Sequence, residues 1–147
     1  MIAKGSEMIE LTKEFLTDGL KKQIYEGFSH HAIEETGYDE KFDPVAFIAR
    51  TKNGQFAGAI VGELFWGTFH IKYVYIVKEH RGQRIASKLM ENALNYGKEN
   101  KCPFAFVETM SFQALDFYQK LGFQLEYTRT GYAHGTSFHY LRKDLGE

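Results

Sequence analysis

The sequence predicts one α/β domain built on a mixed, mostly antiparallel sheet that is flanked by helices. Residues 45–77 contain three strand-like runs separated by short turns, which is typical of an antiparallel meander. Residues 84–100 repeat apolar side chains at helical spacing, and residues 104–145 add a strand, a helix and two closing strands. The chain has 147 residues and no linker-like stretch, so we expect a single domain over residues 1–147.

The composition argues against several classes of protein. Hydrophobic residues make up 44% of the chain, which is enough for a packed core. The formal net charge is −1, from 18 basic and 19 acidic residues, so no long-range field attracts nucleic acid or a membrane surface. Cys102 is the single cysteine and cannot form an internal disulfide, and no apolar run has the length of a membrane span. We expect a cytoplasmic protein with neither nucleic acid nor membrane as a partner.

The meander begins at the apolar run VAFIAR, residues 45–50. The following TKNGQ contains Asn-Gly, the strongest short hairpin signal, and predicts a turn into a second strand, FAGAIVGELF, residues 56–65. After Trp66 and Gly67, the run FHIKYVYIV predicts a third strand over residues 69–77.

A helix is predicted from Arg84 to about Asn100. Its apolar positions are expected to pack on the sheet. They are Ala86, Leu89, Met90, Ala93 and Tyr96, and the opposite face carries Lys88, Glu91, Asn95 and Lys98. A second helix is predicted over residues 111–121, ended by Gly122.

The N-terminal third gives weaker signals. Residues 15–28 have a helical pattern, and the polar stretch 30–44 is expected to form a loop or a short helix.

The most informative stretch joins the third strand to the helix through the basic turn KEHRGQ, residues 78–83. The first N–H groups of a helix have no partner within it and carry partial positive charge, which suits a phosphate or pyrophosphate. Arg81 and Arg84 add full charges. A solvated turn with two arginines is the alternative interpretation of this stretch.

This turn resembles the acetyl-coenzyme A signature of the GNAT acyltransferase family. The residues are Arg81-Gly82-Gln83-Arg84-Ile85-Ala86, followed by Ser87, with Arg84 where the family most often has glycine. Because the family binds pyrophosphate here through main-chain N–H groups, an arginine is acceptable if its dihedrals stay helical. The resemblance also implies that the pantetheine arm pairs with the main chain of the preceding strand, at Tyr75 and Val77.

A second signature follows in the family order. SFQALDFYQKLGF, residues 111–123, resembles the family's asparagine-to-Gly-Phe helix, with Ala114, Tyr118, Gly122 and Phe123 in place. Ser111 stands where asparagine is common, so its implied cofactor contact is shorter or bridged by water. Together the two signatures imply the GNAT acyl-CoA N-acyltransferase fold over residues 45–144, with acetyl-CoA as co-substrate and no metal. Paired domains, hence a homodimer, are common in the family.

The implied activity is transfer of the acetyl group to a primary amine of a small molecule or peptide, in one ternary complex. By resemblance, Tyr118 is the general acid that protonates the departing thiolate. A main-chain N–H near Val77 would polarise the thioester carbonyl.

A candidate base follows from counting residues across the predicted β-hairpin. If Trp66-Gly67 is a two-residue loop, Glu63 lies opposite His70, and both side chains share one face with Lys72 nearby. Such a pair could pass the amine's proton to solvent. An ordinary cross-strand polar pair is the alternative, and a change of one residue in the loop would separate the two side chains.

Other function classes remain as alternatives. A non-catalytic acyl-CoA sensor would keep the phosphate-binding turn but would not need a phenol at Tyr118. Another kind of nucleotide-binding domain is disfavoured, since the chain lacks the G-x-x-x-x-G-K-[ST] and G-x-G-x-x-G patterns. The six histidines show no metal-ligand spacing, and Cys102 is interpreted as structural rather than nucleophilic.

Overall fold

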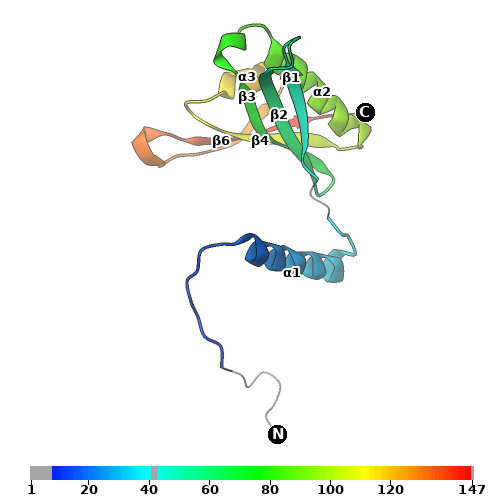
Figure 1. Cartoon of the computed structure of the whole chain (residues 1–147), viewed down its shortest axis with the longest axis vertical. Helices are drawn as coiled ribbons and strands as arrows, with labels where there is room; N and C mark the ends of the chain where they lie inside the picture. Colours follow the sequence, from blue (N-terminus) through cyan, green and yellow to red (C-terminus); the bar gives the residue numbers. More distant parts are fainter. Residues whose placement is uncertain (1–7, 41–42, 147) are drawn as a thin grey trace. The chain divides into compact units, whose positions relative to one another are not determined.

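The computed structural model describes residues 8–40 and 43–146 (Figure 1). The chain divides into two compact units, Met1–Glu40 and Lys41–Glu147, and each is described by itself. One domain over residues 1–147 stays a prediction. No helix within the described residues is both long enough and apolar enough to cross a membrane.

The first unit contains the helix α1, Asp18–Thr36. Its N-cap is Thr17, whose side chain accepts a hydrogen bond from the Leu20 N–H at 3.1 Å. It ends at Gly37, which adopts a left-handed conformation and donates its N–H to the Ile33 carbonyl. The helix predicted over 15–28 begins at Asp18 and continues to Thr36, so it takes up the first part of the stretch 30–44, for which a loop or a short helix was expected. No proline interrupts the sequence between the two caps.

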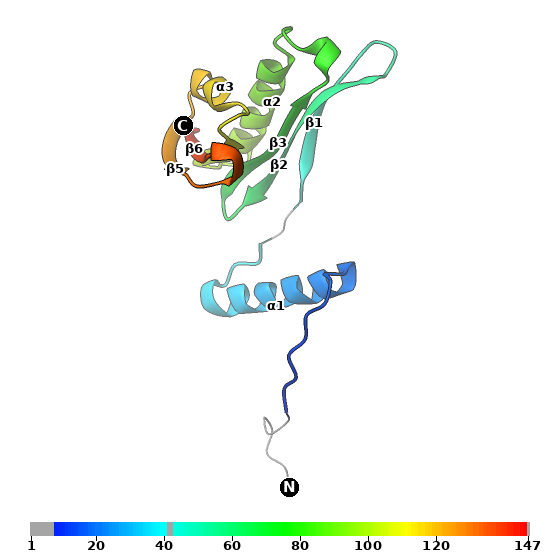
Figure 2. The same ribbon diagram turned by 90° about the vertical axis from the view of Figure 1, so that its left-hand side faces the viewer.

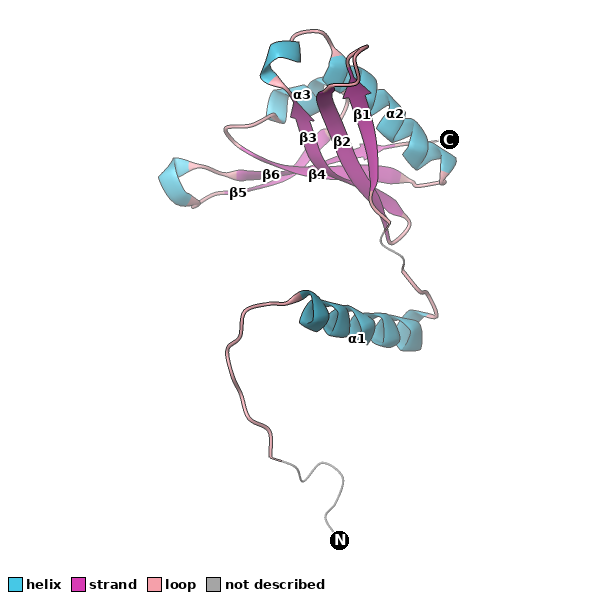
Figure 3. Ribbon diagram, in the orientation of Figure 1, coloured by secondary structure: helices cyan, strands magenta, loops and turns pink. Residues whose placement is uncertain are grey.

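In the second unit, residues 43–146 form one six-stranded sheet in the order β1-β2-β3-β4-β6-β5 (Figure 3). Only β3 and β4 pair in parallel. The mixed, mostly antiparallel sheet flanked by helices is thus confirmed. The strands are β1 Val45–Arg50, β2 Phe56–Phe65, β3 Thr68–Ile76, β4 Phe104–Met110, β5 Gln124–Arg129 and β6 Phe138–Asp144.

The helix α2, Ile85–Glu99, covers one face of this sheet (Figure 2). The predicted apolar face is confirmed at Leu89, Met90 and Ala93, which are buried, while the predicted polar positions are exposed. Gly97 lets the helix approach closely, because an added Cβ would lie 2.9 Å from the Leu145 side chain and 3.5 Å from that of Phe69. The largest fully buried side chains of the core are those of Phe69, Ile60, Ile71, Met90, Leu141 and Val107.

The helix α3, Leu115–Lys120, is shorter than the predicted 111–121. Residues 111–114 form a turn, in which Gln113 accepts a hydrogen bond from the Met110 N–H and Ala114 donates its N–H to the Thr109 hydroxyl. Ala114 has φ −138°, outside the helical region, so the helix begins after it. Two short 3-10 segments, Lys78–His80 and Ala133–Gly135, complete the described elements.

Candidate active site

Strands β3 and β4 pair with each other along only part of their length. They pair at Phe69↔Ala105, His70↔Phe106 and Ile71↔Val107, and both strands continue beyond the last of these pairs. The cause lies on β3, where Val61 pairs with Tyr73 and Gly62 with Ile71, which leaves Lys72 as an extra, bulged residue. A bulge bends its strand and strengthens its twist. The result is a gap between the carboxyl ends of β3 and β4 (Figure 1).

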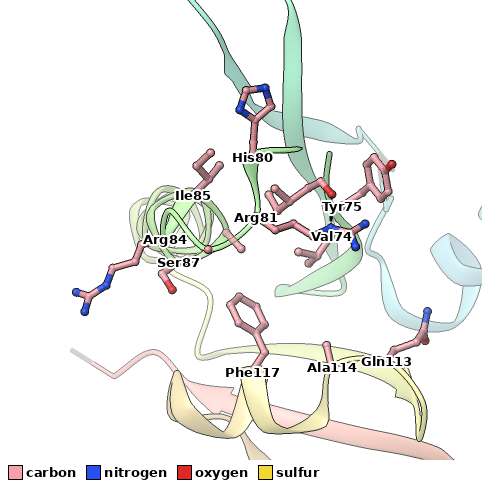
Figure 4. A pocket seen from close by; sticks show the side chains of 13 residues that line it. Val74, Tyr75, His80, Arg81, Arg84, Ile85, Ser87, Gln113, Ala114 and Phe117 are labelled. Atoms are coloured by element: carbon pink, nitrogen blue, oxygen red, sulfur yellow. Dashed lines mark hydrogen bonds between the residues drawn. The ribbon is translucent and has the colours of Figure 1, made fainter. Parts of the chain in front are cut away.

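A cleft of about 630 Å³ lies at this end of the sheet (Figure 4). It is lined by the end of β3, the turn before α2, the first turn of α2 and the start of α3. The lining residues are Val74, Tyr75, Ile76, His80, Arg81, Gly82, Arg84, Ile85, Ala86, Ser87, Gln113, Ala114 and Phe117. The turn and the strand that the sequence singled out therefore meet in one cleft.

The register of β3 decides which main-chain groups are open to this gap. The Val77 N–H donates to the Ala57 carbonyl at 2.9 Å, so Val77 faces β2. Pairs alternate in an antiparallel ladder, so Tyr75 also faces β2, whereas Val74 and Ile76 turn their N–H and C=O groups toward the gap. The main-chain role expected of Tyr75 and Val77 is thus available at Val74 and Ile76 instead. Tyr75 is among the residues that line the cleft, and Val77 is not.

The turn before α2 is built from two left-handed residues. Gly82 has φ +84° and Arg84, the N-cap of α2, has φ +60°. The expectation that Arg84 keeps helical dihedrals is wrong, because this arginine adopts the conformation that the family's glycine would supply. The first hydrogen bond of α2 runs from the Lys88 N–H to the Arg84 carbonyl. The N–H groups of the three residues between them therefore have no partner within the helix and are open to an anion.

The two arginines point in different directions. Arg81 donates from Nε to the Ile76 carbonyl at 3.0 Å, which holds its side chain across the cleft toward Val74 (Figure 4). Arg84 extends away from the other labelled side chains (Figure 4). Arg81 is thus placed to add charge inside the cleft, and Arg84 contributes chiefly through its main chain.

The α3 side of the cleft differs from the prediction at one position. Ser111 exchanges two hydrogen bonds with Ser137: its N–H donates to the Ser137 carbonyl and its hydroxyl accepts from the Ser137 N–H. It does not line the cleft. Gln113 does, together with Ala114 and Phe117, and the shift follows from the turn that precedes α3.

Tyr118 lies beside the cleft rather than on its lining. Its ring is buried, with 5% exposed, and packs against Phe117 and Phe123. Its hydroxyl has no hydrogen-bond partner among the described residues. Every buried side-chain polar atom of those residues does have a partner, so the Tyr118 hydroxyl is not buried and reaches solvent. Burial, with a smaller contribution from the charge of Glu108, raises the pKa of Tyr118 to about 12. The phenol therefore stays protonated at neutral pH.

The predicted hairpin register is confirmed: Phe65 pairs with Thr68, Leu64 with Phe69, and Glu63 with His70. The side chains, however, have other partners. His70 Nε2 lies 2.8 Å from Glu108 Oε1, and its ring stacks on Phe106 with centroids 4.3 Å apart. Glu63 forms an ion pair with Lys72, Nζ to Oε1, at 3.3 Å. The structure thus brings His70 together with Glu108 of β4 rather than with Glu63.

Comparison with known proteins decides the family. The model of the "Acetyltransferase (GNAT) family" matches residues 8–123, which is more than half of the chain. The chain belongs to this family. Blasticidin-S acetyltransferase from Streptomyces morookaense is 33% identical to this GNAT acetyltransferase over 95 residues, which cover 64% of this chain and 70% of that protein.

Solved structures show the same fold. An acetyltransferase from Bacillus cereus ATCC 14579 superposes with a TM-score of 0.78 at 20% identity, covering 91% of this chain and 97% of the other. A protein from Bacillus anthracis str. Ames, solved in complex with acetyl coenzyme A, has a TM-score of 0.63 at 23% identity and covers 74% and 66% of the two chains. GNAT acetyltransferases use acetyl-CoA, and the cleft described above has the open amides and the arginine that its phosphates require.

Most of the predicted cofactor residues of this GNAT acetyltransferase meet in the cleft. Those that line it are Tyr75, Arg81, Gly82, Arg84, Ile85, Ala86 and Ser87, and those that do not are Val77, Gln83 and Ser111. Val74 and Ile76 were not predicted as cleft residues. In an antiparallel pair, successive residues face the partner strand alternately, so a prediction of the bulge at Lys72 would have identified them. Cys102 is buried, and burial raises the pKa of its thiol. Within the described ranges, no group of three or more His, Cys, Asp or Glu side chains is arranged to hold a metal ion.

The raised pKa of Tyr118 has a measurable effect on stability. A tyrosine whose pKa is higher in the folded than in the unfolded protein stabilises the fold below the unfolded value and loses that contribution as pH rises through the folded value. Between pH 10 and about 12 the native protein should lose about 2 kcal/mol relative to Tyr118→Phe. Urea unfolding of both proteins at pH 9 and pH 11.5 measures the difference. Parallel losses in the two proteins would contradict it.

Proposed function

We propose that this acetyltransferase moves an acetyl group from acetyl-CoA directly to the primary amine of a small molecule in a ternary complex. The observation that supports this most is the cleft lined by the end of β3, the phosphate-binding turn and the start of α3, at the end of the sheet where β3 and β4 no longer pair. The name of blasticidin-S acetyltransferase, a relative that covers 64% of this chain, favours a small-molecule acceptor over a peptide.

Two groups of the chain are suited to bind the cofactor along the cleft. The open N–H groups at the start of α2 and the Arg81 guanidinium face the place where a pyrophosphate would bind. The free main-chain groups of Val74 are suited to pair with the pantetheine amides, as an added strand would. When bound, acetyl-CoA supplies a thioester whose carbonyl carbon forms a bond to the neutral amine while its bond to sulfur breaks.

Two proton transfers accompany this exchange. We assign the first to His70: with Glu108 ionised, the hydrogen between them lies on Nε2, so Nδ1 is free to take the proton that the ammonium must lose. Glu63 forms an ion pair with Lys72, so we assign it no proton transfer. Its effect is limited to the electrostatic field around His70. The second transfer is from the Tyr118 hydroxyl to the departing thiolate, for which the high pKa of Tyr118 keeps the proton available.

Binding is tested first. Coenzyme A at about a hundred times its dissociation constant should add about 2.7 kcal/mol to the free energy of unfolding and raise the melting temperature by roughly 5–10 °C. Pantetheine, which lacks the phosphates, should give a much smaller shift at the same concentration. Ser111→Ala, outside the cleft, is a matched control and should keep the full response. A melting curve that coenzyme A leaves unmoved would refute the cofactor assignment.

Activity is tested by thiol release from acetyl-CoA in the presence of a panel of primary amines. A thiol signal that requires both the enzyme and an amine supports direct transfer. Binding of acetyl-CoA without thiol release, for every amine tried, would favour a sensor module instead.

A further inference from the structure

A second hollow, of about 410 Å³, lies on the sheet face opposite α2. It is walled by aromatic rings from the β2–β3 hairpin and from β4 and β6. These rings belong to Phe65, Trp66, Phe104, Phe106 and Tyr140. A wall of flat rings suits a flat ligand, and its π faces also attract cations.

The residues that line this hollow carry charges of both signs, with the acidic residues in the majority. Glu108 and Glu126 contribute two carboxylates, and Arg142 contributes one cation. Arg142 is already paired, Nε to Asp144 Oδ1 at 2.8 Å, and its guanidinium lies 3.8 Å from the centre of the Phe104 ring. The chain itself therefore places a flat cation on one of these rings, which shows that the wall accepts such a group.

Glu126 enters the hollow through an irregularity in β5. Leu125 pairs with Leu141 and Tyr127 with Tyr140, so Glu126 is an extra residue in the ladder, and bulges commonly redirect a side chain. Glu126 has no hydrogen bond or ion pair to any residue that the structure describes. Its carboxylate is thus free to meet a ligand's charge.

Glu108 connects this hollow to the reacting end of the cleft. It follows Val107, the last residue of β4 that pairs with β3, and it holds His70 at 2.8 Å. Its charge also acts on Tyr118. A ligand in the hollow would therefore have one end beside His70, where β3 and β4 begin to part.

We propose that this hollow is the acceptor subsite and that it selects an amine carrying a second, flat positive group, with Glu126 as the partner of that group. This inference rests on the proposed acetyl transfer and adds the class of acceptor. The flat cation lies among the aromatic rings near Glu126, and the amine to be acetylated points past Glu108 toward the gap between the strands.

Three four-carbon amines that differ only at the far end test this class. Agmatine carries a flat guanidinium, putrescine a compact ammonium, and N-acetylputrescine a flat neutral amide. With acetyl-CoA saturating, kcat/KM should be highest for agmatine, by about tenfold over N-acetylputrescine, mainly through KM. Equal kcat/KM for all three would overturn the subsite assignment.

Two variants locate the effect at Glu126, an exposed residue whose substitution leaves the core intact. Glu126→Gln should lower kcat/KM for agmatine about threefold to tenfold and leave that for N-acetylputrescine unchanged. Glu126→Lys should lower the agmatine value further. Glu91→Gln, an exposed position on α2, is the control and should change none of the three.

The outcomes separate this inference from the proposed function. Acetylation of all three amines with no response to Glu126 overturns the subsite and leaves acetyl transfer standing. No thiol release with any amine, while coenzyme A still raises the melting temperature, overturns both.

Discussion

Tyr118→Phe should lower the turnover number about a hundredfold to ten-thousandfold while changing the affinity for acetyl-CoA little, because it removes one proton donor and keeps the ring. The ring packs against Phe117 and Phe123, and phenylalanine preserves both contacts. Steady-state kinetics with a saturating amine, together with calorimetric titration of coenzyme A, give the two quantities.

Tyr96→Phe is the matched control for this variant. Tyr96 is a half-buried tyrosine of α2 whose ring packs against Phe47 and Phe69, and no step of the reaction is assigned to it. Its turnover should stay within about twofold of the native value. If Tyr118→Phe behaves like Tyr96→Phe, then Tyr118 is a core residue and the thiolate takes its proton from water.

Gly82→Pro should weaken coenzyme A binding by at least about tenfold, whereas Arg84→Gly should change it by less than about threefold. Proline holds φ near −65°, and Gly82 requires +84°, so the turn that presents the α2 amides cannot form. Arg84→Gly keeps the main chain that faces the cleft. It also removes the backbone strain of an arginine in the left-handed conformation, so the free energy of unfolding should rise by about 1 kcal/mol.

Titration calorimetry and urea unfolding measure the two parts of this prediction. Because Gly82→Pro disturbs the fold locally, a near-ultraviolet spectrum close to the native one is needed to interpret its affinity. Similar losses of affinity in the two variants would mean that the Arg84 guanidinium itself binds a phosphate, against the outward direction of its side chain (Figure 4).

Local sequence signals were enough for much of the fold. The β2–β3 register followed from the two-residue loop Trp66-Gly67, because counting outward from that loop places Glu63 opposite His70. The buried face of α2 followed from the spacing of Leu89, Met90 and Ala93. In each case neighbours along the chain, or across one tight turn, decide the outcome.

Three other features were not predictable in this way. His70 pairs with Glu108, which belongs to a strand that lies beside β3 only after the chain has passed through α2. The left-handed Arg84 follows from the geometry of the turn and not from its own preference. The late start of α3 depends on the Thr109 hydroxyl, which binds the Ala114 N–H that a longer helix would have used.

The extra residue at Lys72 divides β3 into two halves that would serve the two substrates by different chemistry. In the proposed reaction, His70, before it, acts on the acceptor through its side chain, and Val74, after it, pairs with the cofactor through its main chain. Substitutions in the first half can therefore change which amine is accepted without altering the cofactor's hydrogen bonds. Removing Lys72 would restore regular pairing to Gly62, close the gap and abolish both sites at once. In the proposed reaction, the first half of the strand is therefore free to vary in its side chains as long as the second half keeps its main-chain geometry.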